Sequence, residues 1–280
     1  MSRYLVQFSQ SLLGGLGLLW LFLEAFYGLN PSKPPAMGFL AFLALGILIG
    51  IFWFVVDGLW ISGFLQRSIK ITSNAIDTAI SIKFGDLIAQ EGCKAISVNE
   101  YFDSTVDGQH VSSNSLHGIM LTRFWPGNIN DWDRQVDEDL ADVTPLKQIV
   151  TRPAPGKQVK YAIGTTARTC TNGQEFLCVS LTRTNTETLQ ASATSKDLHL
   201  AIRGLLRKAR RICGGNALNI PLIGSGLART GIKPNIIVDL ILLAIFEESK
   251  KQKVTNDIRI ILPISMRKSI DLTTIQKDWR

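Results

Sequence analysis

The sequence predicts an α/β fold, a mixed β-sheet covered by helices, preceded by a two-helix transmembrane hairpin. Three observations support this prediction. Two long apolar segments fill most of the first 60 residues. After them, short runs rich in β-branched residues alternate with segments of helical periodicity. The charge is also divided: two of the 30 Lys and Arg and two of the 23 Asp and Glu precede residue 67, so the remainder carries the whole net charge of +7.

The two apolar segments are each close to the roughly 20 residues that a helix needs to cross a bilayer. The intervening sequence NPSKPP contains three prolines, which break the helix and make the two segments antiparallel. A cleaved signal peptide is the alternative for the first segment, but a small-x-small cleavage site is missing and a second apolar segment follows. We therefore expect transmembrane helices at 11–29 and 36–57 within a membrane region of residues 1–66.

Basic residues at the ends of the hairpin indicate its orientation. Arg3 precedes the first segment, Arg67 and Lys70 follow the second, and Lys33 lies at the tip. Because lysine and arginine favour the cytoplasmic side, both ends and the following domain are expected in the cytoplasm. The prediction is a multi-pass protein of the inner (plasma) membrane.

Two features of the apolar segments go beyond simple anchoring. The sequence GILIG places Gly46 and Gly50 on one helical face, where two helices can approach closely. Glu24 lies inside the first segment, and either a functional carboxylate or a protonated, snorkelling residue explains it. Asp57 is interpreted as an interfacial residue.

The first half of the remaining chain predicts strands joined by loops. Residues 67–78 are expected to form a linker that continues the second helix, followed by short strands at 79–84 and 93–99. A polar loop follows at 101–115, and an acidic amphipathic helix at 130–143. Asn172-Gly173 between two β-prone runs predicts a two-residue hairpin that pairs Cys170 with Glu175.

The second half alternates helices and strands. Apolar residues recur every three or four positions over 195–213, which predicts a helix whose other face is basic. That basic face suits anionic lipid or nucleic acid, or is simply solvated. Buried strands are expected at 216–223 and 257–264, on either side of an apolar helix that opens near Pro234. The strand–helix alternation favours a sheet covered by helices.

The cysteines and histidines predict no metal site. The four cysteines have no CxxC or other metal-ligand spacing, and the three histidines are scattered. We expect four free thiols, as in a reducing compartment, and no cofactor.

The glycine-rich turn in IPLIGSGLARTG, residues 220–231, suits a phosphate group. Glycine lets the backbone approach a ligand closely, and free backbone N–H groups in such a turn bind anions. The dinucleotide fingerprint G-x-G-x-x-G is not met, because Arg229 stands in place of its third glycine. Alone, the turn is also compatible with a tight turn that binds nothing.

Three motifs in order, IKFGDL, ISVN and IPLIGSGLARTG, together resemble a macro domain, the α/β fold that binds ADP-ribose. The resemblance covers roughly residues 75–270 and implies a macro-like nucleotide-binding domain at 79–280. It implies that Asp86, with Leu87 beside it, reads the adenine amine, and that Asn99 leads into the first phosphate-side loop. The implied loop and turn residues are Asn114, Ser115, Leu116, His117, Gly118, Gly224, Ser225, Gly226, Leu227, Ala228 and Arg229.

The first loop departs from the pattern of the family's hydrolases. They usually carry Asn-Ala-Ala-Asn followed by a glycine run, whereas this chain has NEYFD and no glycine run. A binding role is therefore expected rather than an enzymatic one. Glu100 and Tyr101, next to Asn99, are the candidates for contacting a group beyond the distal ribose.

Two membrane helices ahead of such a domain resemble the membrane-bound macro-domain effectors of Thoeris anti-phage defence. In that family a TIR-domain partner makes an NAD-derived signal, the macro domain binds it, and the transmembrane region damages the membrane. The resemblance implies an ADP-ribose derivative as ligand, with a histidine conjugate as one candidate, a homo-oligomer, and lipid but no nucleic acid as partner. A membrane-anchored ADP-ribosyl hydrolase and a membrane-tethered nucleic-acid binder are the alternatives; the second would bind any polyanion in a salt-dependent way.

Overall fold

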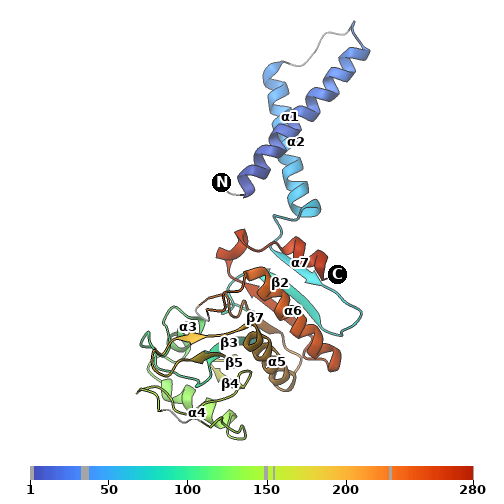
Figure 1. Cartoon of the computed structure of the whole chain (residues 1–280). Coiled ribbons are helices and arrows are strands. Elements are labelled where there is room, and N and C mark those ends of the chain that lie inside the picture. The colour runs from blue at the N-terminus through green and yellow to red at the C-terminus, as the bar shows by residue number, and fades with distance from the viewer. Residues whose placement is uncertain (1–2, 33–37, 148–150, 154, 227–228, 280) are drawn as a thin grey trace. The chain divides into compact units, whose positions relative to one another are not determined.

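The computed structural model of the chain describes residues 3–32, 38–147, 151–153, 155–226 and 229–279. These residues form two compact units (Figure 1). The first, called the head, comprises Met1–Arg67 with Asp271–Thr274, and the second, called the body, comprises Ser68–Ile270 with Ile275–Arg280.

The head consists of two apolar helices, α1 (Arg3–Leu29) and α2 (Phe39–Val56), followed by a π-helical turn at Asp57–Ile61. The stretches Leu5–Leu29 and Phe39–Ile61 have mean hydropathies of 1.7 and 2.8. By length and composition both can cross a membrane. The expected pair of apolar helices is therefore present, and α1 begins earlier in the chain than the sequence indicated.

The two helices of the head cross each other (Figure 1), and glycines make the close contacts between them. Gly46 and Gly50 of α2 are both buried. A Cβ atom on Gly50 would lie 2.7 Å from the Cα of Leu12, and one on Gly15 would lie 2.5 Å from the backbone nitrogen of Gly50. Only glycine allows such an approach of two backbones. The close approach expected at GILIG is confirmed, and its partner is α1 of the same chain.

The body is built on one mixed sheet with the strand order β1-β2-β8-β7-β3-β5-β4, and β6 pairs with β5. Neighbours from β2 through β5 in this order are parallel, and β1, β4 and β6 pair antiparallel to their neighbours. The strands are β1 (Ser68–Ile71), β2 (Ala79–Phe84), β3 (Cys93–Asn99), β4 (Thr166–Thr171), β5 (Gln174–Thr184), β6 (Ala191–Ser192), β7 (Leu218–Pro221) and β8 (Asp257–Leu262).

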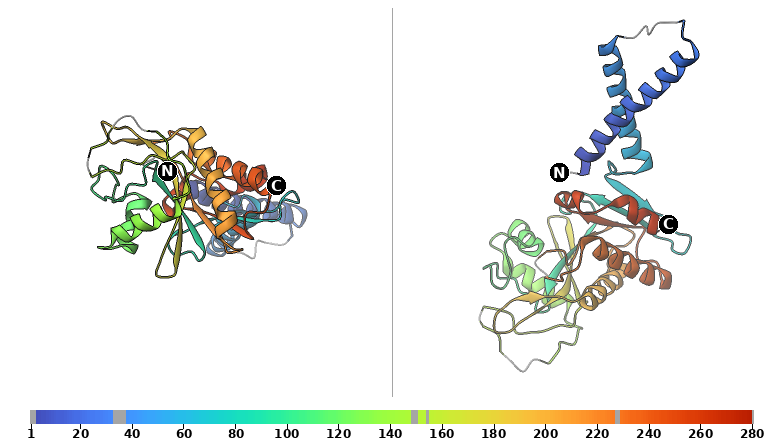
Figure 2. Two further views of the ribbon diagram at one scale, coloured as in Figure 1. Left: turned by 90° about the horizontal axis from the view of Figure 1, so that it is seen from below. Right: turned by 45° about the horizontal axis from the view of Figure 1, so that its top comes forward.

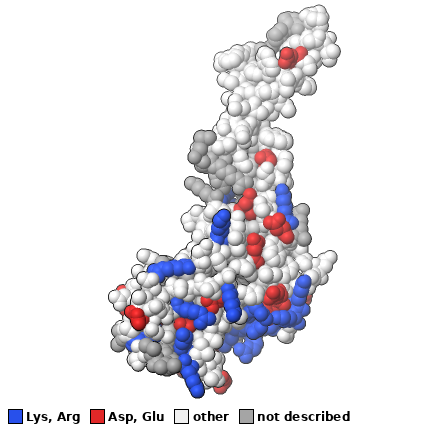
Figure 3. Space-filling view, viewed as in Figure 1, with Lys and Arg blue, Asp and Glu red and all other residues white. Residues whose placement is uncertain are grey.

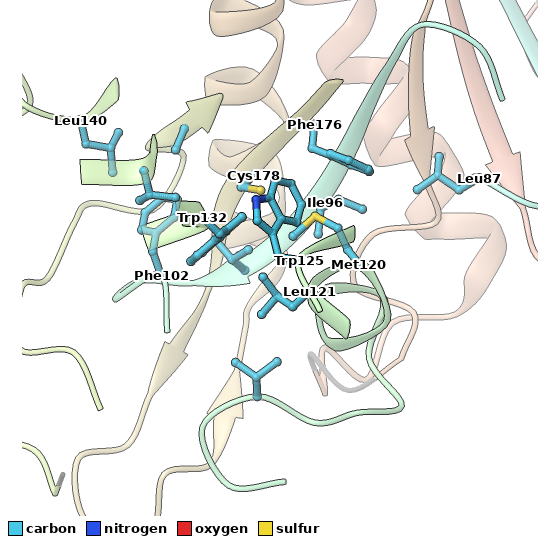
Figure 4. Close-up of a cluster of buried hydrophobic side chains, with 14 of the residues drawn as sticks. Leu87, Ile96, Phe102, Met120, Leu121, Trp125, Trp132, Leu140, Phe176 and Cys178 are labelled. Atoms are coloured by element: carbon cyan, nitrogen blue, oxygen red, sulfur yellow. The ribbon is translucent and has the colours of Figure 1, made fainter. Parts of the chain in front are cut away.

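Helices cover the sheet, with α5 and α6 packed against each other and α3 and α4 lying apart from that pair (Figure 2). Their bounds are α3 (Leu116–Phe124), α4 (Ile129–Asp139), α5 (Ser195–Ile212) and α6 (Pro234–Lys251), and a 3-10 turn at Ile264–Lys268 and α7 (Leu272–Asp278) follow β8. The predicted mixed sheet covered by helices is therefore confirmed. Its core under α3 and α4 gathers Trp125 and Trp132 with Phe176 of β5 (Figure 4).

Several local predictions are confirmed by the strands and helices of the body. Asn172 and Gly173 have φ angles of 49° and 71°, as a two-residue hairpin requires, and Cys170 pairs with Glu175. Helix α5 starts where its periodicity predicted. A capping box fixes that start, because the Thr194 hydroxyl accepts from the Asp197 amide and the Asp197 carboxylate accepts from the Thr194 amide.

The segment 67–78 differs from the expectation that it continues the second helix. It contains β1, which pairs antiparallel with β2. The physical reason is the alternation in β1, where Ile69 and Ile71 are buried while Ser68 and Lys70 are exposed. The division of the chain at 1–66, 67–78 and 79–280 stays a prediction.

Candidate functional site

The sheet topology brings the three sequence motifs to one edge. Strands β2, β8, β7, β3 and β5 are neighbours and run parallel, so their carboxyl ends share an edge of the sheet. Asp86 follows β2, Asn99 ends β3, and the glycine turn follows β7. In open α/β sheets this edge is where ligands bind. We call it the carboxyl edge.

The turn after β7, which the resemblance assigns to the diphosphate as an anion cradle, is shaped by a glycine and by two side-chain hydrogen bonds. Gly224 has a φ of +89°, which glycine adopts without strain. The turn is held by Ser225 Oγ, which donates to the Leu222 carbonyl (2.8 Å), and by Thr230 Oγ1, which donates to the Gly224 carbonyl (2.8 Å). Within the described ranges, the amides of Gly224 and Gly226 have no hydrogen-bond acceptor.

Space is available beside this turn. A Cβ on Gly226 would meet no atom of the described residues within 4 Å, and Gly226 is exposed. Arg229 is also exposed, with a φ of 48°. Helix α6 begins only at Pro234, so the turn precedes the helix rather than forming its first turn. Leu227 and Ala228, which the resemblance also assigned to the cradle, lie outside the described residues.

Asp86 is exposed just beyond the end of β2, whereas Leu87 is buried in the core. The Asp86 Oδ1 atom accepts from the Ile88 amide at 2.9 Å, which fixes the carboxylate over its own turn. The Gln90 side chain also donates to the Asp86 carbonyl at 2.7 Å. The carboxylate therefore faces solvent at the carboxyl edge in a defined orientation, as an acceptor for an amine requires.

The side chain of Asn99 organises the loop that follows β3. Its Oδ1 accepts from the amides of Tyr101 and Asp103, both at 3.2 Å, and its Nδ2 donates to Asp103 Oδ2 at 2.7 Å. Such side-chain-to-backbone bonds hold a turn in one shape. Asn99 is buried, so in this structure it shapes the loop from within.

Glu100 and Tyr101 are buried as well, each 1% exposed. Glu100 Oε1 accepts from the Thr184 amide and pairs with Lys160 Nζ, both at 3.2 Å. The Tyr101 ring lies 3.8 Å from the guanidinium carbon of Arg152, and burial, together with the charge of Glu100, raises the pKa of Tyr101. Glu100 Oε2 and Tyr101 Oη have no hydrogen-bond partner in the part of the chain that the structure describes.

A buried ion pair beneath this loop was not anticipated from the sequence. Arg152 contacts Asp103 through two hydrogen bonds of 3.0 and 2.8 Å, and the two side chains are 0% and 1% exposed. The Lys157 amide also donates to Asp103 Oδ1 at 2.9 Å. The pair fastens the segment around Arg152 to the loop that follows Asn99. The partners are 49 residues apart, and no local pattern links them.

The segment 112–118 forms the N-terminus of α3. Ser115 caps the helix, because its Oγ accepts from the Gly118 amide at 2.9 Å and donates to the Ser112 carbonyl at 2.6 Å. Asn114 is exposed and Leu116 is half-buried. Burial lowers the pKa of His117 to about 3, so its ring, 5.4 Å from that of Trp132, is neutral at pH 7.

The cysteines and acidic residues do not gather into a metal site. Among the described residues, no group of three His, Cys, Asp or Glu side chains is placed to hold a metal ion. All four cysteines are free thiols, and burial raises the pKa of Cys178 to about 12.

Comparison with known proteins shows the family to which the chain belongs and solved structures with a similar fold. The model of the family described as "Thoeris protein ThsA, Macro domain" matches residues 80–263. The curated "Thoeris protein ThsA" of Bacillus amyloliquefaciens (strain Y2) is 25% identical over 163 residues, which are 57% of this chain and 53% of that protein. The chain thus spans about half the length of this curated relative.

Solved structures of the Oceanobacillus iheyensis macrodomain are similar in fold. The structure with ADP aligns with a TM-score of 0.52 at 12% identity, covering 76% of this chain and 97% of that chain. A mutant of the same macrodomain with ADPR gives 0.52 at 13% identity, covering 75% and 97%.

Proposed function

Because the chain belongs to the Thoeris protein ThsA macro-domain family, we propose that its body binds an NAD-derived signal at the carboxyl edge and that the chain acts in anti-phage defence. The signal in this proposal is an ADP-ribose derivative, with a histidine conjugate as one candidate. It would be supplied by a TIR-domain partner.

The single observation that carries this proposal is the convergence at the carboxyl edge. Asp86 offers an acceptor for the adenine amine at one end of the edge. The turn after β7 offers amides without acceptors among the described residues, beside open space at Gly226. A nucleoside diphosphate has a base donor and an anionic diphosphate, and it matches both features.

The proposal extends to the membrane through the head. Both of its helices are long and apolar enough to cross a bilayer. We propose that they form a multi-pass hairpin in the inner membrane, that the body is cytoplasmic, and that signal binding in a homo-oligomer makes the bilayer leaky.

The proposal is tested by calorimetry with the full-length protein in detergent. The titrants are ADP-ribose, NAD and a histidine conjugate of ADP-ribose. Gly226→Glu places bulk and negative charge where the diphosphate should lie, and we expect at least a tenfold loss of affinity. Gly226→Ala is the matched control, since a Cβ there meets no atom of the described residues within 4 Å, and it should bind like wild type. Equal affinity of the folded Gly226→Glu variant would show that the site lies elsewhere.

Binding without turnover separates this function from the alternative of an ADP-ribosyl hydrolase. Chromatography of an ADP-ribosylated substrate incubated with the full-length protein measures turnover directly. We expect the substrate to remain intact while the nucleotide binds. Release of free ADP-ribose, lost in Gly226→Glu, would favour the hydrolase instead.

A further inference from the structure

The body carries two oppositely charged helices at the edge of its sheet. Helix α4 has five acidic residues and one arginine, and Asp142 follows it. Helix α5 has six lysines and arginines and one aspartate. Both helices pack against the edge strand β4. Figure 3 shows Lys and Arg side chains gathered on one part of the body, with acidic side chains among them.

The two helices meet around β4 and enclose a groove. Lys208 of α5 reaches Asp139 of α4, with 2.6 Å between Nζ and Oδ2. An open groove of about 690 Å³ lies there, with Asp139 and Asp142 on one side and four basic residues of α5 on the other. Val143 and Leu200, each 37% exposed, also line it and add apolar surface. Apolar surface rimmed by charged residues is typical of a protein interface.

Ion pairs within the chain engage some of these charges, and others have no ion-pair partner among the described residues. Arg203 and Arg207 share the buried carboxylate of Glu248, at 2.9 and 3.4 Å, and most of the Arg207 side chain stays exposed. Across the ranges that the structure describes, Arg211 and Asp142 have no ion-pair partner, although both are exposed in the groove. The carboxylate of Glu248 holds the two arginines in place, and Arg211 and Asp142 leave one charge of each sign in the same groove.

A surface with adjacent acidic and basic halves is complementary to itself under two-fold rotation. In such an isologous contact residue i of one copy meets residue j of the other, and j meets i. The acidic half of one copy then faces the basic half of its partner, twice. A polyanion would instead bind best to a uniformly basic surface, and Asp139 and Asp142 in this groove would repel it. The adjacent charges therefore favour a second copy of this chain over a polyanion.

We propose that the charged edge surface, formed by Asp139 and Asp142 with Arg203, Arg207 and Arg211, joins two copies of this chain about a two-fold axis. This inference goes beyond signal binding and does not rest on it, because none of these residues lies at the carboxyl edge. Added salt should weaken the contact, because the Debye length falls from about 8 Å at physiological ionic strength to about 3 Å at 1 M salt.

The first test uses the wild-type full-length protein. Equal amounts of ¹⁴N- and ¹⁵N-labelled protein are mixed in detergent and treated with a zero-length carbodiimide, which joins lysines to carboxylates. We expect mixed-isotope cross-links between the α4 segment and the lysines of α5, Lys196 and Lys208, and their loss at 1 M salt. Cross-links that are only within one chain would overturn the proposal.

The second test exchanges the charges. Arg207→Gln with Arg211→Glu makes the surface acidic, and Asp142→Lys makes it basic. All three residues are exposed, so folding should persist, and thermal unfolding checks this. Capture of an untagged chain by a tagged chain is then compared in four pairings: wild type with itself, each variant with itself, and the acidic variant with the basic variant.

We expect capture between two copies of the same variant to fall at least tenfold below that of wild type. Capture between the acidic and the basic variant should return to the wild-type level. Association through the head raises all four pairings equally and leaves this contrast intact. Equal capture in all pairings would refute the two-fold contact.

Discussion

Removing the buried guanidinium of Arg152 is the sharpest test of how the loop after β3 is held. Asp103 is 1% exposed and accepts four hydrogen bonds, of which Arg152 donates two, at 3.0 and 2.8 Å. The other two come from the Lys157 amide at 2.9 Å and from Asn99 at 2.7 Å. Arg152→Met keeps the apolar stem but leaves a buried carboxylate without its cation.

The expected loss follows from this geometry. Breaking one side of a buried ion pair costs about 3–5 kcal/mol, because the remaining charge is neither solvated nor paired. Two charged hydrogen bonds at about 1.5–3 kcal/mol each give a similar figure. Adding Asp103→Asn removes the orphaned charge, so the double variant should be more stable than Arg152→Met alone.

Urea unfolding of the full-length protein in detergent measures this loss. The fluorescence of Trp125 and Trp132 reports on the body, since both rings are buried in its core (Figure 4). The matched control is Arg134→Met. The Arg134 side chain is 57% exposed and pairs on the surface, where solvent weakens ion pairs, so its loss should leave the unfolding midpoint close to that of wild type. If the two variants unfold at the same urea concentration, Arg152 does not stabilise the fold as argued.

The remaining predictions concern the adenine site, a buried acid and the head. Asp86→Ala should weaken ADP-ribose binding by about 1.5–3 kcal/mol in calorimetry, the range for a hydrogen bond to a charged group, and an unchanged affinity would rule the assignment out. Burial works to raise the pKa of Glu248, but its basic partners outweigh this and hold the pKa at about 2. Its stabilisation is therefore present above the unfolded pKa of about 4.3 and is lost as pH falls toward 2. Glu248→Gln should unfold with a flatter pH dependence over that window, and identical slopes would contradict this. Gly46→Leu with Gly50→Leu should spare nucleotide binding and reduce ligand-triggered dye release from liposomes. Gly17→Leu, where a Cβ meets no atom within 4 Å, should not reduce it, and wild-type release that is equal with and without ligand would defeat the gating idea.

Features encoded within a few neighbouring residues were predictable from the sequence. The hairpin at Asn172-Gly173 follows from the positive φ angles that these two residues tolerate. The helix at Ser195–Ile212 follows from its apolar periodicity. The shared edge of the three motifs, in contrast, comes from the parallel pairing of strands that are distant in the sequence, and it was not predicted.

Features that depend on distant partners were not predictable in this way. Strand β1 has only four residues and lies directly after the apolar head, so its alternation was mistaken for a helical continuation. The pair of Asp103 and Arg152 joins two loops that share no local pattern. Tyr101 is buried against Arg152 and Glu100 pairs with Lys160, and both partners are distant in the sequence. Their assignment to the ligand stays a prediction, as do those of the other site residues.

The glycines of α2 show why a motif can predict a contact without predicting its partner. GILIG indicates only that some helix approaches closely. In the structure that helix is α1, because a Cβ on Gly50 would lie 2.7 Å from the Cα of Leu12 and 2.8 Å from the carbonyl oxygen of Ser11. The glycine face is therefore occupied within one hairpin. In the proposed homo-oligomer, contacts between hairpins would use other faces, where Glu24 of α1 and Leu48 and Phe52 of α2 are exposed. Leucines at Gly46 and Gly50 would thus act by separating the two helices of one hairpin rather than by blocking contacts between copies.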